Sequence, residues 1–218
     1  MTLDWGRRTY VMGIINVTPD SFSGDGLLDE GGIENVIERA QRLVAEGADV
    51  LDIGGESTRP GSVPVSAETE MKRVIPAIRA VRAATGDALI SIDTYRADVA
   101  AAALDAGANW INDVWGLRMD PEMAALAAVR RCPVVIMHNR SKPKDVVQEQ
   151  ALGGRYVGVH YDDLLRDISA ELSEQVHLAL KSGIAVEQII LDPGIGFGKT
   201  VEQNLELLDR LDEIKRLG

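Results

Sequence analysis

The chain of 218 residues is poor in cysteine and phenylalanine, and it has no long apolar run. Its one cysteine, Cys132, excludes an internal disulfide and fits a reducing compartment, so we expect a cytoplasmic protein. The apolar neighbours of Cys132 favour a buried structural thiol over a nucleophile.

No apolar run approaches the ~20 residues that span a bilayer. The charged residues Asp4, Arg7 and Arg8 do not fit a signal peptide, so we expect no membrane partner.

Basic residues are fewer than acidic ones. The chain has 23 basic and 34 acidic residues, which gives a net charge of −11. Such a balance argues against a general nucleic-acid binder or a protein of anionic membranes. An anionic small-molecule substrate stays possible because a few local basic residues can oppose the global sign. A hydrophobic content of 45% and a charged content of 26% are ordinary for a globular protein.

What the sequence does have is a regular alternation of strand-like and helix-like segments. The apolar patterns predict strands at 10–17, 49–53, 89–94, 110–114, 133–138 and 189–193. They predict helices at 33–46, 68–84, 96–106, 121–130, 162–182 and 201–217, with a polar segment at 139–161. This order predicts parallel strands covered by helices, with both faces of the strands buried.

Polar residues near the ends of the strands favour a closed barrel over an open sheet. The glycine-rich dinucleotide fingerprint is absent after the first strand. Instead, polar residues stand at or near the carboxyl ends of the six strands: Asn16, Asp52, Asp93, Asn112, His138 and Asp192. A barrel gathers residues from many strand ends around one mouth. We therefore predict an α/β fold of the (β/α)₈ TIM-barrel type, as a single domain over residues 1–218.

Each of these residues also has a purely structural interpretation. Asp93 could cap the following helix, and Asp52 lies deeper in its strand, which favours a buried hydrogen bond. A turn or a satisfied strand end would explain Asn112, His138 and Asp192. As a set, however, buried carboxylates and amides are costly without partners. They predict a polar ligand, such as a heterocycle that presents an N–H beside an NH₂ group to a carboxylate.

Two loops add features of a binding site. The segment GGESTRPG at 54–61 offers hydroxyls, a guanidinium and backbone N–H groups to an anion, or it is an ordinary Gly/Pro turn. The segment DPGIGFGKT at 192–200 is not a phosphate loop, because Pro193 stands where that motif needs its first glycine. Phe22 and Phe197, the only phenylalanines, fall in loops and could wall a pocket for a flat aromatic substrate.

Six segments closely resemble the motifs of the dihydropteroate synthase family, in order and at similar spacing. They are NVTPDSFSGDG, LDIGGESTRPGS, ISIDTYRADVA, INDVWG, VVIMHNR and ILDPGIGFGKT, and the resemblance covers residues 10–217. The resemblance implies a (β/α)₈ barrel that acts in folate synthesis and is a target of sulfonamides. Such an enzyme joins p-aminobenzoate to 6-hydroxymethyl-7,8-dihydropterin diphosphate with Mg²⁺ and releases pyrophosphate.

The resemblance also implies roles for single residues. Asp192 would accept two hydrogen bonds from the pterin, Asn112 and Asp93 would bind other ring nitrogens, and Met137 would pack on the ring. Asn16 would reach the Mg²⁺ and the diphosphate. The p-aminobenzoate pocket would consist of Phe22, Thr58, Arg59, Pro60 and Phe197.

The first loop departs slightly from the family. Its common Ser-Asp-Gly-Gly reads Ser-Gly-Asp-Gly at 23–26, which makes Asp25 the candidate for stabilising a cation on the pterin methylene. A loose, SN1-like displacement of this kind relies on positioning and charge stabilisation more than on a strong base.

Only six βα units can be counted. The family's seventh strand supplies a Lys, and its eighth an Arg and a His, so we expect a chain that lacks its last two units. The homodimer expected for the complete family is then doubtful for this chain. Three functions stay open: a synthase, a pterin-binding methyltransferase, and a pterin-binding protein without catalysis. The Ser-Thr-Arg-Pro loop and the first loop favour the synthase.

Overall fold

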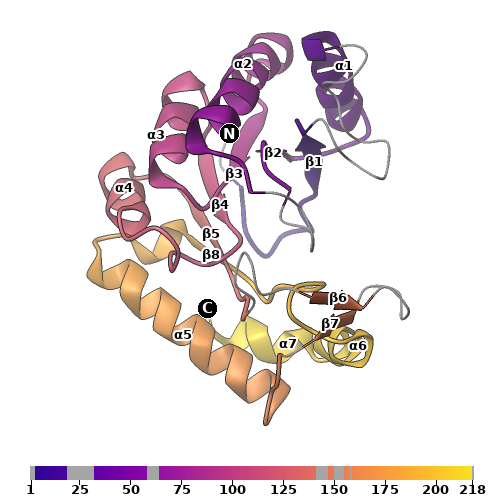
Figure 1. Cartoon of the computed structure of the whole chain (residues 1–218), viewed down its shortest axis with the longest axis vertical. Helices are drawn as coiled ribbons and strands as arrows, with labels where there is room; N and C mark the ends of the chain where they lie inside the picture. Colours follow the sequence, from indigo (N-terminus) through magenta and orange to yellow (C-terminus); the bar gives the residue numbers. More distant parts are fainter. Residues whose placement is uncertain are drawn as a thin grey trace. The chain divides into compact units, whose positions relative to one another are not determined.

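The computed structural model describes residues 3–18, 32–57, 64–140, 147–149, 155–157 and 159–217. The chain divides into two compact units, one of residues 1–57 and 64–112 and the other of residues 58–63 and 113–218 (Figure 1). The single domain expected over residues 1–218 stays a prediction. Five predicted site residues lie outside the described residues: Phe22, Asp25, Thr58, Arg59 and Pro60.

The first unit alternates strands and helices as predicted. Its elements are β1 (Met12–Asn16), α1 (Gly32–Ala45), β2 (Val50–Gly54), α2 (Ala67–Thr85), β3 (Leu89–Asp93), α3 (Ala97–Ala106) and β4 (Trp110–Asp113). Strand β2 pairs with β1 and β3, and β3 pairs with β4, each in parallel. Helix α2 begins where the Ser66 side chain accepts a hydrogen bond from Thr69 N, and it ends at Gly86. This alternation confirms the predicted α/β class.

One face of this sheet is apolar and lies under helices α1 to α3 (Figure 1). Its central register row consists of Ile15, Ile53, Ile92 and Ile111, all fully buried. The opposite face is mostly polar towards the ends of the strands. Burial on both faces is confirmed for β2 and β3 but is wrong for β1, where Ile14 is 48% exposed.

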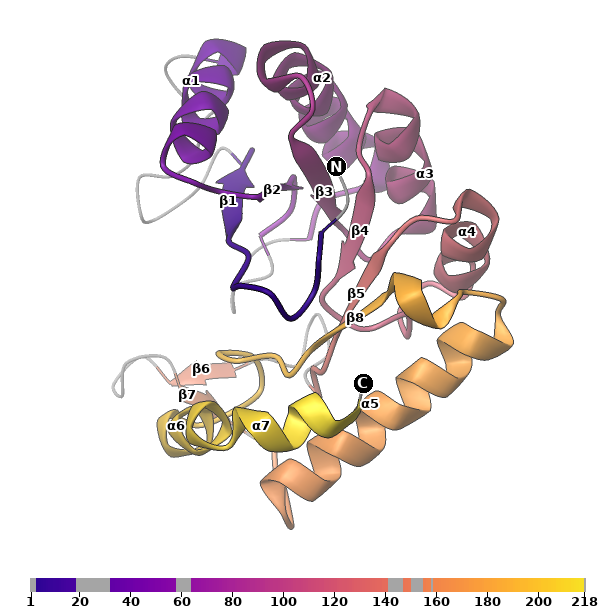
Figure 2. The ribbon, with the colours of Figure 1, turned by 180° about the vertical axis from the view of Figure 1, so that it is seen from behind.

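The second unit contains the remaining strands and helices. They are α4 (Met123–Arg130), β5 (Val134–Met137), β6 (Val147–Glu149), β7 (Arg155–Val157), α5 (Leu164–Lys181), η2 (Val186–Gln188), β8 (Ile189–Asp192), α6 (Val201–Asp209), α7 (Leu211–Ile214) and η3 (Lys215–Leu217). Strands β5 and β8 pair in parallel. Helix α5 packs on α6 and α7 (Figure 2). The core there consists of Tyr161, Leu164, Leu165, Ile168, Leu172, Leu207 and Ile214.

Two segments differ from the prediction. The polar segment 139–161 contains β6 and β7, which form a short antiparallel pair. The single helix expected at 201–217 is broken at Arg210, whose φ of −111° and ψ of 28° are not helical. The Arg210 guanidinium pairs with Glu206 before the break and with Glu213 after it. An apolar pattern cannot detect such a break, because both pieces bury the same side.

No helix within the described ranges is long and apolar enough to cross a membrane.

Candidate functional site

Three predicted site residues lie in one register row at the carboxyl end of the first unit's sheet. Asn16 is the register partner of Gly54, Gly54 of Asp93, and Asp93 of Asn112. Residues in register on neighbouring parallel strands point to the same face, so the three polar side chains share one face. A Cβ on Gly54 would lie 3.1 Å from Asp93 Oδ2. The glycine therefore leaves the space beside the Asp93 carboxylate.

Asp52 lies on the same face, two residues before Gly54, and only 2% of it is exposed. Its Oδ2 accepts a hydrogen bond of 2.9 Å from Asn112 Nδ2. The structural interpretation of Asp52 is thus confirmed, and burial raises the pKa of its carboxyl. The Ser91 hydroxyl lies beside this carboxyl and, like the Asn112 amide, works against the rise in its pKa.

Asp113, the residue after Asn112, has a different task. Its carboxylate accepts hydrogen bonds of 2.9 Å from the backbone N–H groups of Trp115 and Leu117. Burial raises the pKa of Asp113 to about 6. Asp113 therefore holds the turn after β4, whereas Asn112 faces the polar side of the sheet.

In the second unit, Met137 and Asp192 are register partners at the ends of β5 and β8. Met137 is buried, and Asp192 is partly buried. Asp192 Oδ1 accepts a hydrogen bond of 2.7 Å from Gly194 N, so the residue does begin a turn. Burial raises the pKa of this carboxyl. Each carboxylate oxygen can accept two hydrogen bonds, so the turn leaves capacity for a ligand that offers two donors.

The loop from Pro193 to Thr200 contains a buried lysine whose role the sequence analysis missed. Only 2% of Lys199 is exposed, and its Nζ donates to the carbonyl oxygens of Gly194 at 2.8 Å and Phe197 at 3.0 Å. Burial lowers the pKa of Lys199 to about 7. Phe197 itself lies in this loop and is partly buried, and its place in a p-aminobenzoate pocket stays a prediction. The sequence offered one signal for Lys199, a lysine after three alternating glycines.

His138 is a satisfied strand-end histidine. Its Nδ1 lies 3.2 Å from Lys199 Nζ, and its Nε2 lies 3.0 Å from Glu171 Oε2. Burial and Lys199 lower the pKa of His138 to about 4, so the ring is neutral at ordinary pH. Glu171 also accepts a hydrogen bond of 2.7 Å from Arg140 Nε.

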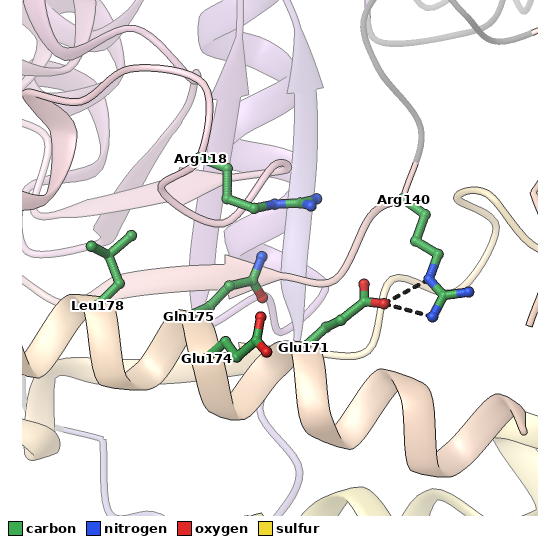
Figure 3. Close-up of a pocket in the computed structure, with 6 residues that line it drawn as sticks. All are labelled: Arg118, Arg140, Glu171, Glu174, Gln175 and Leu178. Carbon is green, nitrogen blue, oxygen red and sulfur yellow. Dashed lines mark hydrogen bonds and ion pairs between the residues drawn. The ribbon is translucent and has the colours of Figure 1, made fainter.

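Glu171 and Arg140 face a pocket of about 620 Å³ on one side of α5 (Figure 3). Its lining consists of Arg118, Arg140, Glu171, Glu174, Gln175 and Leu178. None of these is a predicted site residue, and charges of both signs line the pocket. The pocket gives solvent access to the outer end of the Glu171–His138 pair.

A buried ion cluster joins segments of the first unit, and the sequence analysis also missed it. Arg96 pairs with Glu56 and with Glu70, of which only 1% is exposed, and its Nη2 donates to Val65 O at 2.9 Å. Burial raises the pKa of Glu70. Because Glu56 precedes residues 58–63 in the sequence and Val65 follows them, Arg96 ties together two described segments of the chain.

Metal ligands are sparse in the part of the chain that the structure describes. No group of three or more His, Cys, Asp or Glu side chains there could hold a metal ion. Asn16 ends β1 and is partly buried. An amide oxygen suits Mg²⁺, which keeps several waters and binds substrate phosphates rather than a full protein cage. Asn16 would therefore supply one oxygen ligand, with water and substrate phosphates as the others, and Mg²⁺ stays a prediction.

Comparison with known proteins gives one family throughout. The family model for pterin binding enzymes matches residues 12–218. A dihydropteroate synthase of Synechocystis sp. is 48% identical over 215 residues, which cover 99% of this chain and 70% of that protein. The solved dihydropteroate synthase of Clostridium difficile, determined in the presence of pteroic acid, has a TM-score of 0.86 and 44% identity, and the match covers 100% of this chain and 76% of that one.

A second solved structure agrees. The dihydropteroate synthase of Xanthomonas albilineans with 4-aminobenzoic acid has a TM-score of 0.82 and 40% identity, over 97% of this chain and 71% of that one. These likenesses confirm the predicted barrel type of α/β fold. The chain therefore belongs to the pterin binding enzyme family, alongside dihydropteroate synthases.

Proposed function

We propose that this chain is a dihydropteroate synthase of folate biosynthesis. It condenses p-aminobenzoate with 6-hydroxymethyl-7,8-dihydropterin diphosphate and releases pyrophosphate. The observation that carries the proposal is the 48% identity to a dihydropteroate synthase over 99% of the chain. The strand-end positions of Asp93, Asn112 and Asp192 support it, because a pterin needs carboxylate and amide partners of this kind.

The pterin edge that carries N3–H and the 2-amino group would donate both hydrogen bonds to Asp192. A carboxylate meets two parallel donors better than any neutral side chain does. Met137 would pack against the flat ring, and Asn112 and Asp93 would bind other ring nitrogens. Asp52 holds the amide nitrogen of Asn112, so the amide oxygen is the atom that Asn112 offers as an acceptor.

Asn16 would hold the diphosphate end together with Mg²⁺. When bound there, Mg²⁺ would neutralise charge on the diphosphate and make it a better leaving group. Asp25, in the first loop, would stabilise the cation that develops on the pterin methylene.

The displacement itself would be loose. The bond from the pterin methylene to the diphosphate oxygen breaks, and its electron pair leaves with pyrophosphate. The amine of p-aminobenzoate then forms the new C–N bond and loses a proton to solvent. His138 is no candidate for a general base, because Lys199 engages its Nδ1 and Glu171 engages its Nε2. Catalysis would rest on positioning and on charge stabilisation.

The p-aminobenzoate pocket would consist of Phe22, Thr58, Arg59, Pro60 and Phe197. Sulfonamides would compete for it. We expect the enzyme to work in the cytoplasm on small-molecule substrates, without nucleic acid. A homodimer is the expectation for the complete family.

The deciding experiment is p-aminobenzoate-dependent release of pyrophosphate from the dihydropterin diphosphate, with and without Mg²⁺. Turnover that Asp192→Ala abolishes supports the synthase. Pterin binding without any turnover by the wild type supports instead a pterin-binding protein without catalysis. Methyl transfer from a folate, without pyrophosphate release, supports the methyltransferase.

A further inference from the structure

We propose that Lys199 is a positioning residue that orients the Asp192 carboxylate for the pterin. It acts through the β8–α6 turn and is held in place by His138 and Glu171. The inference rests on the proposed function, because it takes Asp192 as the pterin ligand. Lys199 itself would touch no substrate.

The Lys199 ammonium has as many partners as it has protons to donate. A lysine ammonium carries three N–H donors and no acceptor. Its three partners are Gly194 O at 2.8 Å, Phe197 O at 3.0 Å and His138 Nδ1 at 3.2 Å. Phe197 N also donates to Gly194 O at 3.1 Å and closes the turn. The buried cation therefore replaces the water that the two turn carbonyls would otherwise need.

The same turn sets the carboxylate. The carbonyl oxygen of Gly194 accepts a hydrogen bond from Lys199 Nζ. The N–H group of Gly194 donates a hydrogen bond of 2.7 Å to Asp192 Oδ1. Gly194 has a φ of +71°, and a Cβ on it would lie 1.9 Å from His138 O. The backbone at this point is packed too closely to shift independently. A change at Lys199 Nζ would therefore reach the Asp192 carboxylate through one residue.

His138 connects this turn to α5. For its Nδ1 to accept a hydrogen bond from Lys199, the ring proton must sit on Nε2, which faces Glu171 Oε2 at 3.0 Å. A carboxylate at this place fixes that tautomer. Arg140 holds Glu171 from the pocket side (Figure 3). Glu171 and His138 thus hold Lys199 in the orientation that supports the turn.

A purely structural role of Lys199 and a positioning role predict different results when the residue is replaced. Loss of a structural lysine would lower the free energy of unfolding and leave the affinity of the folded protein for pterin unchanged. Loss of a positioning lysine would weaken pterin binding in the folded protein. In turnover, the KM for the dihydropterin diphosphate would then rise more than kcat falls.

The test is a calorimetric titration of 6-hydroxymethylpterin into the full chain and its variants. Lys199→Met removes the ammonium and keeps the length of the side chain. Lys181→Met is the matched control, because Lys181 is exposed at the end of α5. Thermal melting confirms that each variant is folded. We expect Lys199→Met to weaken pterin binding by about tenfold and Lys181→Met to leave it unchanged.

A folded Lys199→Met with wild-type pterin affinity overturns the inference and leaves the proposed function standing. A folded wild type that binds no pterin overturns the proposed pterin site and the inference with it. If Lys199→Met does not fold, Glu171→Met decides instead. It removes the acceptor of the His138 ring proton, and we expect about threefold weaker pterin binding and a ¹⁵N shift of His138 towards mixed tautomers. Unchanged affinity and shifts in that variant contradict the inference.

Discussion

The amide nitrogen of Asn112 on β4 donates a hydrogen bond of 2.9 Å to the buried carboxylate of Asp52 on β2. The bond passes across β3, which lies between the two strands. It fixes which end of the Asn112 amide is left for a ligand.

Asp52→Ala should therefore weaken pterin binding although Asp52 is not assigned to the pterin. Without its acceptor, the Asn112 amide can rotate, and a buried donor left unpaired also costs about 1 to 3 kcal/mol of stability. Pterin titration and urea unfolding measure the two effects. Asp52→Asn is the control, because it keeps an acceptor oxygen at the same place. Equal pterin affinity in the two variants would show that the bond does not orient Asn112.

Asp192→Asn should nearly abolish pterin recognition. The Asn side chain keeps one acceptor oxygen, but its NH₂ group would face an N–H donor of the pterin. Loss of a hydrogen bond to a charged group costs about 1.5 to 3 kcal/mol of binding free energy. We expect affinity to fall on the order of a hundredfold, measured by titration with 6-hydroxymethylpterin. Asp209→Asn, exposed on α6, is the matched control. Wild-type affinity in Asp192→Asn would remove Asp192 from the pterin site.

His138 should make the fold sensitive to acid. Its pKa is lowered to about 4 in the folded chain, against an ordinary value of 6.5. Between these values the unfolded chain binds the proton and the folded chain does not, so stability is lost as the pH falls from 6.5 towards 4.

His138→Gln should lack this component, so the stability of the wild type relative to the variant should decrease as the pH falls from 6.5 towards 4. The comparison is needed because the raised pKa of Asp113, about 6, works in the opposite direction over the same range. Urea unfolding at several pH values measures it. His177→Gln, at an exposed position of α5, is the matched control substitution. The same slope in His138→Gln as in wild type would refute the assignment.

Arg96→Leu should destabilise the first unit. It would leave Glu56 and Glu70 close together without their shared cation, and breaking such a buried pair costs about 3 to 5 kcal/mol. Arg79→Leu, at an exposed position of α2, should change stability by less than about 0.5 kcal/mol. Chemical unfolding of both variants checks this. Similar stabilities would mean that the cluster contributes little.

Phe197→Ala should raise the KM for p-aminobenzoate by about fivefold, because a ring contact with an aromatic substrate is worth about 1 kcal/mol. In the wild type, a sulfonamide should raise the apparent KM for p-aminobenzoate and leave that for the dihydropterin diphosphate unchanged. Steady-state pyrophosphate release with each substrate varied in turn measures both. Inhibition that p-aminobenzoate does not relieve would place the sulfonamide elsewhere.

The sequence by itself determined the alternation of strands and helices and the residues at the strand ends. Asn16, Asp93, Asn112 and Asp192 stand at or next to the last residue of their strands, because strand ends are marked locally by apolar runs that stop at polar residues. The motif from Asp192 to Thr200 likewise shows its turn in its own glycines.

Only the tertiary structure decided which polar groups are partners. Asn112 meets Asp52 across 60 positions of sequence, and Lys199 meets His138 across 61. Burial, which sets the pKa values of Lys199 and His138, is likewise a property of the packed chain. Local sequence patterns show which residues a strand or a turn needs. Hydrogen bonds between distant segments depend instead on register and packing, because no short stretch of the sequence contains both the donor and the acceptor.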